Sequence, residues 1–308
     1  MKCLVTGGAG FIASHLVDRL IKEGNEVVVI DNLSTGRKEN INTESKFYEA
    51  DICEQRIIDI FQKEKPECVF HYAAQISVDQ SIKNPIKNSE INIIGSLNVL
   101  EASKNSGVKK IFFPSSVGVY GDNTDLPLTE EKDLNPVSNY AFSKLIFEKY
   151  LNYYRKDIDF IFFRLANVYG PRQINTGEGG VISIFIDNAL SNRPSFIYGD
   201  GSQTRDFVYI DDVVDANILL LNSAQKNLYF NVSTNQEIEI NSLYQLVYEQ
   251  SGCNLPPIFK LKREGDIYRS CISYEKINRE CGWQPKIDIA EGLKKTVEWI
   301  KSSKNAKK

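Results

Sequence analysis

The chain has 308 residues, of which 42% are hydrophobic and 25% are charged. That length is enough for one large domain or two closely joined ones, and the composition is ordinary for a globular protein. The net charge of −3 gives no reason to expect binding to nucleic acid or to an acidic membrane surface, and no apolar run approaches the ~20 residues that span a bilayer.

Predicted strands and helices alternate through the first half of the chain. Strands are predicted at 2–6, 26–31, 46–49, 68–71, 110–113 and 160–165, and helices at 11–22, 86–103 and 138–155. The first helix carries apolar residues at helical spacing, and the β-branched run at 26–31 is typical of a strand buried on both faces. This alternation predicts an α/β fold with a doubly wound parallel sheet of the Rossmann type.

The regular alternation loosens after about Gly170. Glycines interrupt the chain at 177, 179 and 180, and helices are predicted among short strands near 211–221, 241–250 and 289–301. We therefore expect a second, smaller α+β portion. The approximate division is into 1–170 and 171–308, and segments of the two portions can interleave.

The first predicted strand runs into a glycine-rich turn at 6–10 that opens the first helix. Its glycines permit a tight turn, so that a pyrophosphate can approach backbone N–H groups at a helix N-terminus. Asp31 ends the second strand, 21 residues after Gly10. An acid there can accept hydrogen bonds from both ribose hydroxyls and would repel a 2′-phosphate, which favours NAD over NADP. Arg37 and Lys38 could neutralise such a phosphate, and we interpret them as solvated loop charges.

Three side chains form a candidate catalytic set. Tyr140 and Lys144 are four residues apart in a predicted helix, hence on one face. A tyrosine of pKa near 10 is a poor base at neutral pH, but a neighbouring ammonium and a cationic nicotinamide would both lower that pKa. Ser116 follows a predicted strand and can hydrogen-bond the same substrate oxygen. The alternative is an ordinary tyrosine and lysine on an amphipathic helix.

Metal and hydrolase chemistry lack candidates in this sequence. Its two histidines, His15 and His71, have no partner at metal-ligand spacing, so neither a metal site nor a Ser-His-Asp triad is expected. The six cysteines occur singly, without a C-x-x-C pattern, and are interpreted as reduced residues of a cytoplasmic protein. The first residues also lack the pattern of a signal peptide.

These features resemble the extended short-chain dehydrogenase/reductases and, within them, the UDP-glucose and UDP-N-acetylglucosamine 4-epimerases. The resemblance covers nearly the whole chain. Its motifs are TGGAGFIAS at 6–14, DNLSTG at 31–36, HYAAQISVDQS at 71–81, SSVGVYG at 115–121, YAFSK at 140–144, RLANVYGPRQ at 164–173, GDGSQTRDFVYIDDV at 199–213 and REGD at 263–266. One departure is Ala13, where the family usually has a third glycine, and its methyl group should loosen the helix–strand packing only slightly.

The resemblance assigns binding residues to NAD and to a UDP-sugar. Those assigned to NAD are Gly7, Gly10, Phe11, Ile12, Asp31, Asn32, Ser34, Thr35, Gly36, Asp51, Ile52, Ala73, Ala74, Gln75, Tyr140 and Lys144. Those assigned to the substrate are Ser116, Asn167, Val181, Arg205, Arg263, Asp266 and Ser270. Arginines can meet phosphate oxygens bidentately, which fits a diphosphate. The alternative for each arginine is a surface ion pair, for example of Arg205 with Asp206.

The resemblance implies an NAD-dependent 4-epimerisation of a UDP-hexose through a 4-keto intermediate. Dehydratase relatives carry an Asp-Glu pair directly after the serine or threonine, whereas this chain has Val117 and Gly118. A decarboxylase or a uronate 4-epimerase needs a group that recognises a sugar carboxylate, and Arg269 is a candidate. A non-catalytic NAD-binding module is a further alternative, although such relatives typically lose the tyrosine or the lysine.

The choice of sugar, the domains and the assembly also follow from the resemblance. Ser270 takes the position where a bulky tyrosine excludes N-acetylated sugars, so UDP-N-acetylglucosamine and UDP-N-acetylgalactosamine are expected substrates beside UDP-glucose and UDP-galactose. Residues 1–170 become an NAD-binding domain and 171–308 a nucleotide-sugar-binding domain. A homodimer is expected through 86–103 and 138–155. The residues that line it or pack inside are Tyr150, Leu151, Tyr153 and Tyr154.

Overall fold

The computed structural model describes residues 1–173, 180–262 and 267–305. The chain forms two compact units, each assembled from three stretches of sequence. Unit 1 comprises Met1–Val119, Leu134–Arg164 and Val214–Phe230, and unit 2 comprises Tyr120–Asp133, Leu165–Val213 and Asn231–Lys308. The chain therefore passes repeatedly from one unit to the other, and the division of binding roles at residue 170 stays a prediction.

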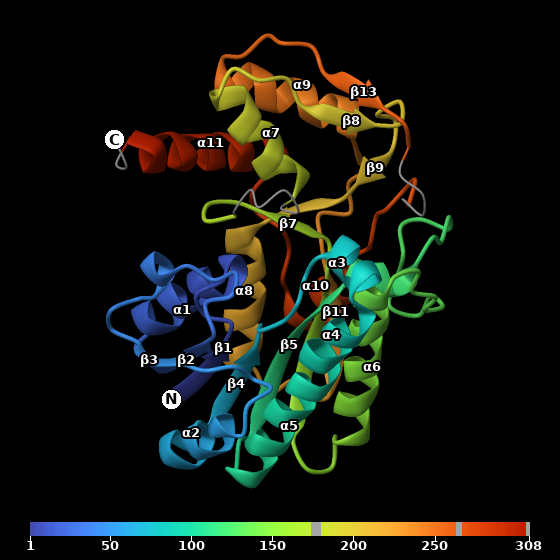
Figure 1. Ribbon diagram of the computed structural model, residues 1–308. Helices are drawn as coiled ribbons and strands as arrows, with labels where there is room; N and C mark the ends of the chain where they lie inside the picture. The colour runs from blue at the N-terminus through green and yellow to red at the C-terminus, as the bar shows by residue number, and fades with distance from the viewer. Residues whose placement is uncertain (174–179, 263–266, 306–308) are drawn as a thin grey trace. The chain divides into compact units, whose positions relative to one another are not determined.

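A seven-stranded sheet contains all the strands predicted in the first half of the sequence. Its order is β11-β6-β5-β4-β1-β2-β3, and the pairings from β3 to β5 are parallel (Figure 1). The strands are β1 (Lys2–Thr6), β2 (Glu26–Asp31), β3 (Lys46–Glu49), β4 (Cys68–His71), β5 (Lys110–Ser116), β6 (Asp159–Leu165) and β11 (Leu228–Val232). The order changes direction between β1 and β4, the switch point at which doubly wound sheets bind ligands. The predicted Rossmann-type fold is confirmed.

Strand β5 ends at Ser116 rather than at Phe113, where the sequence predicted its end. Its last residue paired with β4 is Phe112, opposite Phe70. Pro114 therefore lies beyond the paired stretch on that side, where the ladder does not need the N–H that proline lacks. Consequently Ser116 is the last residue of a strand and not part of a free loop.

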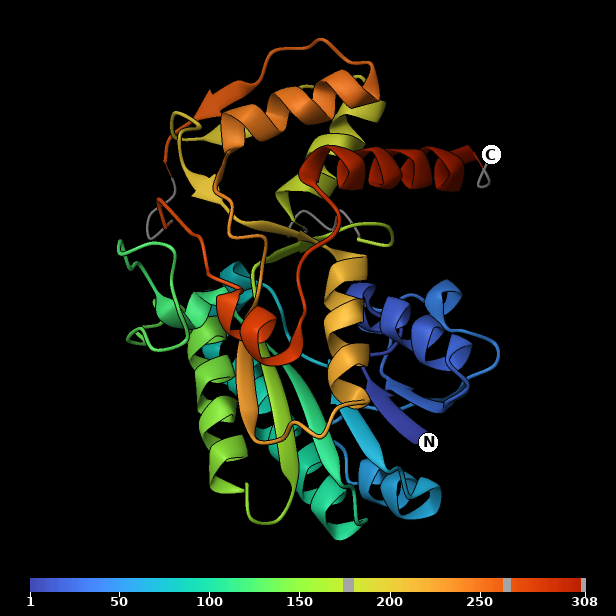
Figure 2. The ribbon, with the colours of Figure 1, turned by 180° about the vertical axis from the view of Figure 1, so that it is seen from behind.

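Helices cover both faces of the sheet in unit 1. They are α1 (Phe11–Lys22), α2 (Arg56–Glu64), α3 (Val78–Lys83), α4 (Pro85–Ser89), α5 (Ser96–Asn105), α6 (Asn139–Tyr153) and most of α8 (Ile210–Leu221), with short turns of 3₁₀ helix at η1 (Lys38–Asn40) and η3 (Val117–Tyr120). On one face, α2, α5 and α6 bury apolar side chains against the strands in a single core. On the other face, α1 and α8 lie side by side (Figure 2). An ion pair between Arg19 and Asp215 at 2.5 Å joins them.

The long helix predicted at 86–103 is interrupted. Between α4 and α5 lies a π-helical segment, η2 (Glu90–Gly95), which buries Asn92 and Gly95. A Cβ added at Gly95 would lie 2.7 Å from Cδ1 of Ile52, so the backbone passes close to a neighbouring side chain. The insertion of such a bulge depends on these distant contacts, and π-bulges often occur at functional sites.

Unit 2 combines small sheets with helices, as predicted for the second portion. Its strands are β7 (Asn167–Tyr169), β8 (Phe196–Tyr198), β9 (Thr204–Arg205), β10 (Phe207–Tyr209), β12 (Ile238–Glu239) and β13 (Ile258–Lys260), and its helices are α7 (Val181–Leu190), α9 (Ile240–Ser251), α10 (Glu275–Cys281) and α11 (Ile289–Asn305). Strand β7 pairs with β10 and β8 with β13 in parallel, and β9 pairs with β12 antiparallel. The rings of Phe185 and Tyr244, 5.3 Å apart, join α7 to α9.

The described residues contain neither a membrane-spanning helix nor a metal-binding cluster. Among residues 1–173, 180–262 and 267–305, no helix is long and apolar enough to cross a membrane. The same part of the chain contains no cluster of three or more histidine, cysteine, aspartate or glutamate side chains that could hold a metal ion.

Candidate active site

The ends of β1, β2 and β4 meet at the carboxyl edge of the sheet in unit 1. The N–H of Gly7 donates to the carbonyl oxygen of Ile30 at 2.7 Å, and the N–H of Tyr72 donates to that of Thr6 at 3.1 Å. These bonds hold the glycine-rich turn between the two neighbouring strand ends. The residues predicted to bind a dinucleotide therefore come from three segments that lie together.

The glycine-rich turn leaves space that a side chain would fill. Gly7 has φ of +72°, and a Cβ there would lie 2.6 Å from the backbone N of Ala73. Gly10 is the N-cap of α1 and supplies no side-chain cap, so the first helical N–H groups, from Phe11 and Ile12 onward, face no capping side chain. Such a helix N-terminus is a binding site for a phosphate group.

The Asp31 carboxylate is fixed beside this turn. Its Oδ2 accepts a hydrogen bond from the N–H of Ala9 at 3.0 Å, and its Oδ1 accepts one from the N–H of Leu33 at 2.8 Å. A Cβ at Gly36 would lie 2.9 Å from Oδ1, so a side chain there would cover the carboxylate. Burial raises the pKa of Asp31, and the two backbone hydrogen bonds oppose that rise.

Other residues predicted to bind NAD lie close to Asp31 in sequence or shortly after β3. Asn32 donates from Nδ2 to Oδ2 of Asp51 at 2.8 Å, and this bond orders both side chains. Ser34 and Thr35 are exposed, while Ile52 is buried. The structure thus brings one polar pair and one apolar contact to this side of the glycine-rich turn.

Asn92 holds the loop that follows β4, and sequence analysis did not single it out. Its Oδ1 accepts from the N–H of Gln75 at 2.8 Å, and its Nδ2 donates to the carbonyl oxygen of Gln75 at 2.9 Å. Nδ2 also lies 3.1 Å from Oγ of Ser143 on α6. The π-helical segment turns Asn92 inward, so only the long-range fold reveals that Asn92 fixes the predicted cofactor residue Gln75 relative to α6.

His71 is a neutral link in the same region. Ser96 Oγ donates to the carbonyl oxygen of Asn92 at 2.8 Å, so it must accept from Nε2 of His71, which lies 2.8 Å away. Nδ1 of His71 then accepts from the hydroxyl of Thr6 at 2.8 Å. Burial lowers the pKa of His71 to about 3, which agrees with a neutral imidazole whose two nitrogens are both satisfied.

The structure brings Ser116, Tyr140 and Lys144 together. Tyr140 lies in the first turn of α6, and the hydroxyl of Ser116 hydrogen-bonds to its phenol. Ser116 Oγ accepts the N–H of Gly118 at 3.1 Å, so its own proton is available to Tyr140. The Nζ of Lys144 is buried 5.8 Å from the centre of the Tyr140 ring and donates to the carbonyl oxygen of Pro114 at 2.9 Å.

The protein's own residues do not lower the pKa of the tyrosine as the sequence led us to expect. Burial raises the pKa of Tyr140 to about 12, and the hydrogen bond from Ser116 opposes this rise. Burial also lowers the pKa of Lys144 to about 7, against the attraction of Glu148. The reason is that the lysine charge, which was expected to stabilise the phenolate, is itself destabilised by the low-dielectric surroundings.

Unit 2 places two of the predicted substrate residues side by side. The N–H and Nδ2 of Asn167 donate to the carbonyl oxygen of Asp206 at 2.9 and 3.0 Å, directly after Arg205 in the chain. The Asp206 carboxylate accepts from the N–H and Oγ1 of Thr234 at 3.0 and 2.7 Å, and burial raises its pKa to about 6. The carboxylate that could have paired with Arg205 therefore has hydrogen-bond donors of its own.

Of the remaining substrate candidates, some lie in described parts of unit 2 and two do not. Val181 is the first residue of α7, and Ser270 is buried with 7% of its surface exposed. Arg263 and Asp266 lie outside the described residues. Arg269 forms a two-pronged ion pair with Glu237, with Nε to Oε2 at 2.9 Å and Nη2 to Oε1 at 2.5 Å.

Comparison with known proteins places this geometry in a family. The model of the NAD dependent epimerase/dehydratase family matches residues 3–233. The chain belongs to the NAD-dependent epimerase/dehydratase family. It is 41% identical to the UDP-glucose 4-epimerase of Mycolicibacterium smegmatis over 310 residues, which cover 98% of this chain and 99% of that protein.

Solved structures of the NAD-dependent epimerase/dehydratase family agree with this assignment. The UDP-glucose 4-epimerase of Thermotoga maritima, crystallised with UDP-glucose, matches with a TM-score of 0.96 and 43% identity over 98% of this chain and 99% of that one. The UDP-N-acetylglucosamine 4-epimerase of Methanobrevibacter ruminantium, in complex with UDP-N-acetylmuramic acid, matches with a TM-score of 0.93 and 35% identity over 98% of each chain.

Family membership confirms that this protein is an enzyme and that NAD is its cofactor. The structure fits that cofactor on two independent observations. The turn at Gly7 leaves space that any side chain would fill, and the buried Oε1 of Gln75 has no hydrogen-bond partner within the described residues. The individual binding and catalytic roles remain predictions.

Proposed function

We propose that this protein catalyses the NAD-dependent 4-epimerisation of UDP-glucose and UDP-galactose, and of their 2-acetamido counterparts. The observation that carries the proposal is the hydrogen bond between Ser116 and Tyr140, with Lys144 one helical turn further on. All three belong to unit 1, which also contains the dinucleotide turn. The residues after Ser116 are Val117 and Gly118, which supply no acid for a dehydration.

The relatives support the substrate class. The similar proteins from Mycolicibacterium smegmatis and Thermotoga maritima are named UDP-glucose 4-epimerases, and the structure from Methanobrevibacter ruminantium is named a UDP-N-acetylglucosamine 4-epimerase. Both names fit a sugar nucleotide whose C4 is inverted. The proposal gives the sugar to Ser116 and Tyr140 and the diphosphate to Asn167, Arg205 and Arg263, with Asp266 as a further substrate-binding candidate.

The chain's own residues move and hold one proton. When bound, NAD supplies the hydride acceptor and donor that oxidise and re-reduce C4 of the sugar. Tyr140 takes the proton of the 4-hydroxyl as C4 is oxidised and returns it as C4 is reduced. Ser116 donates a hydrogen bond to the oxygen that carries the developing charge, and Lys144 supplies the nearby positive charge. Inversion follows when the 4-keto sugar turns over between the two transfers while its nucleotide stays anchored.

The alternative reactions of the family make different demands. A uronate 4-epimerase or a decarboxylase must bind a sugar carboxylate, for which Arg269 was the candidate. In the structure the two-pronged pair with Glu237 already occupies the Nε edge of that guanidinium. This supports a neutral hexose as the substrate. A non-catalytic NAD-binding module gains no support from a chain that keeps Ser116, Tyr140 and Lys144.

The test is to incubate the purified protein, without added cofactor, with a panel of UDP-sugars and to identify the products by NMR. We expect interconversion of UDP-glucose with UDP-galactose and of the two N-acetylated sugars. Formation of a 4-keto-6-deoxy sugar or a pentose would show a dehydratase or a decarboxylase instead. If no UDP-sugar reacts while NAD is retained, the protein is a binding module and the proposal is wrong.

A further inference from the structure

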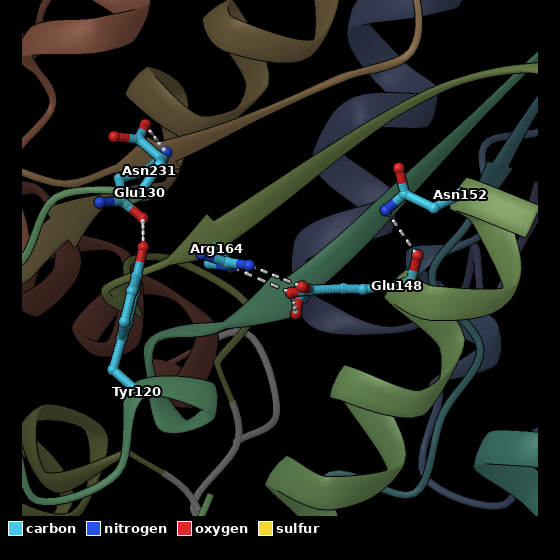
Figure 3. A network of polar contacts seen from close by, with 7 residues as sticks. Tyr120, Glu130, Glu148, Asn152, Arg164 and Asn231 are labelled. Carbon is cyan, nitrogen blue, oxygen red and sulfur yellow. Dashed lines mark hydrogen bonds and ion pairs between the residues drawn. The ribbon is translucent and has the colours of Figure 1, made fainter. Parts of the chain in front are cut away.

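A buried ion pair lies directly behind the catalytic lysine. Glu148 of α6 and Arg164 of β6 meet in two-pronged geometry, with Nη2 to Oε2 at 2.8 Å and Nε to Oε1 at 3.2 Å (Figure 3). Their side chains are 2% and 4% exposed. Burying two charges costs free energy that their attraction offsets only with good geometry, and nonpolar residues of similar volume are often as stable. A merely structural pair therefore has little reason to stand at this position.

Glu148 also holds the strand that carries the catalytic serine. The hydroxyl of Ser115 donates to Oε1 of Glu148 at 2.5 Å, and Ser115 precedes Ser116 in β5. One helical turn earlier, Nζ of Lys144 donates to the carbonyl oxygen of Pro114. Two residues of one face of α6 thus bind two consecutive residues at the end of the strand.

Arg164 is itself held in place, so that it restrains Glu148. Its guanidinium lies 5.0 Å from the centre of the Tyr229 ring and 5.9 Å from that of Phe162. Figure 3 shows it reaching Glu148 from the side of β6, while Asn152 binds the backbone carbonyl of Glu148 on the helix at 3.1 Å. The carboxylate therefore has a fixed position one turn from Lys144.

We propose that Glu148, restrained by Arg164 and Ser115, is a positioning residue that keeps Lys144 in its charged form and aligns Ser116 with Tyr140. This inference rests on the proposed function, since it concerns how the same catalytic set is prepared. In this proposal Glu148 acts through Lys144 and, by way of Ser115, through Ser116.

The charges around Lys144 make its protonation sensitive to Glu148. His71 on β4 faces the lysine and is neutral, and Tyr140 on the same helix is a neutral phenol. Glu148 supplies the attraction that opposes the loss of the lysine proton. Because burial has already lowered the pKa of Lys144 to about 7, a small change in this attraction alters the charged fraction near neutral pH.

The test compares variants that change the charge near Lys144 in opposite directions. Glu148→Gln removes the attraction, so the alkaline limb of the pH profile of kcat/KM moves to lower pH by about one unit. Arg164→Met removes a repelling charge, so the same limb moves to higher pH. The double variant should give a smaller shift to lower pH, because Glu148 is the nearer charge. Glu148→Asp keeps the charge and restores the limb of the unmodified protein.

A second measurement does not depend on turnover. The dissociation constant of NAD is followed by calorimetry from pH 6 to 9, and its pH dependence should shift in the same opposite directions. Asp157→Asn is the matched control, because it removes one carboxylate from an exposed pair with Lys104 in the same unit. It should leave both profiles unchanged. Circular dichroism establishes that each variant folds. If a single variant does not fold, the double variant is compared with the unmodified protein instead.

The outcomes separate this proposal from the proposed function. If the unmodified chain binds NAD but epimerises no UDP-sugar, the proposed function fails while the NAD profiles still test Glu148. Opposite shifts in Glu148→Gln and Arg164→Met support the positioning role. The positioning role would be overturned if every folded variant lost rate equally while the alkaline limb of its pH profile stayed in place. That is the behaviour of a purely structural ion pair.

Discussion

At the residue scale, the proposed reaction depends most directly on the phenol of Tyr140. Tyr140→Phe removes the proton acceptor and keeps the ring, so we expect epimerisation to fall about 10²- to 10⁴-fold. The measurement is the NMR rate with UDP-glucose. Tyr153→Phe is the matched control, because Tyr153 lies on the same helix with 81% of its surface exposed. A Tyr140→Phe variant that kept its rate would remove Tyr140 from the mechanism.

Ser270 is the residue on which the predicted choice of sugar depends. Ser270→Tyr fills the position with a large ring, so we expect loss of activity on UDP-N-acetylglucosamine with UDP-glucose turnover kept within about tenfold. Because Ser270 is buried, the melting temperature of each variant is measured as well. Ser270→Ala leaves the space open and should keep both activities. Equal effects on both sugars would assign Ser270 to packing and not to specificity.

His71 makes the stability of unit 1 depend on acid. Its pKa is about 3 in the folded protein and 6.5 in the unfolded chain, so between these values the unfolded chain binds a proton that the folded protein does not. The stabilisation is complete above pH 6.5 and is lost by about 1.4 kcal/mol per unit as the pH falls toward 3. Urea unfolding at several pH values measures this slope.

The pH dependence of the unfolding free energy is compared between two variants, His71→Gln and the control His15→Gln. The His71 variant should be less stable at neutral pH, since its hydrogen bonds to Thr6 and Ser96 are altered, and its unfolding free energy should depend less on pH between 6.5 and 4. The His15 variant should keep the original slope. If both variants kept it, the acid sensitivity would belong to other groups.

At the element scale, the C-terminal end of α8 is held by a lysine from β5. Nζ of Lys110 lies 2.9 Å from the carbonyl oxygen of Gln225, 3.2 Å from that of Ser223 and 3.5 Å from that of Leu220. Lys110→Met leaves these carbonyls without a charged donor, so we expect a loss of about 1–3 kcal/mol in unfolding free energy. The adjacent Lys109 pairs with Glu67 and is 77% exposed, and Lys109→Met should cost less than about 1 kcal/mol.

The elements that the sequence predicted well are those whose signal is local. Strand β2 has a continuous β-branched run, and the turn after β1 has the glycines that only such a turn requires. Tyr140 and Lys144 were paired because a helix places residues four apart on one face. Each of these inferences needs only neighbouring residues, and the structure agrees with each of them.

Long-range contacts account for what the sequence did not reveal. Asn92 holds Gln75 only because a π-helical segment turns it inward, and that segment depends on packing against Ile52. Glu148 and Arg164 are 16 residues apart in different elements, and each looks like an ordinary surface charge in sequence. The lowered pKa of Lys144 likewise follows from burial, which composition and spacing do not measure.

At the scale of the whole molecule, the exposed apolar side chains of unit 1 indicate a surface that another chain could cover. Of the four residues predicted to line or pack inside a dimer interface, Leu151 is fully buried, Tyr150 packs against the core, and Tyr154 bonds to Glu101, whereas Tyr153 is exposed. The exposed apolar residues of helices α3, α4, η2 and α6 are Val78, Ile82, Ile86, Ile94, Phe142 and Tyr153. Monomeric proteins rarely leave many such side chains in water together.

We therefore expect the homodimer proposed from the sequence to form through these helices of unit 1. Light scattering after gel filtration should give twice the chain mass of 34.9 kDa. Ile86→Asp combined with Phe142→Asp should give the single-chain mass, because two buried carboxylates at an interface cost several kcal/mol unless paired. Leu261→Asp is the control, since Leu261 of unit 2 is 91% exposed and should not alter the mass. If the unmodified protein has the single-chain mass across micromolar concentrations, the predicted dimer is wrong and these side chains have another role.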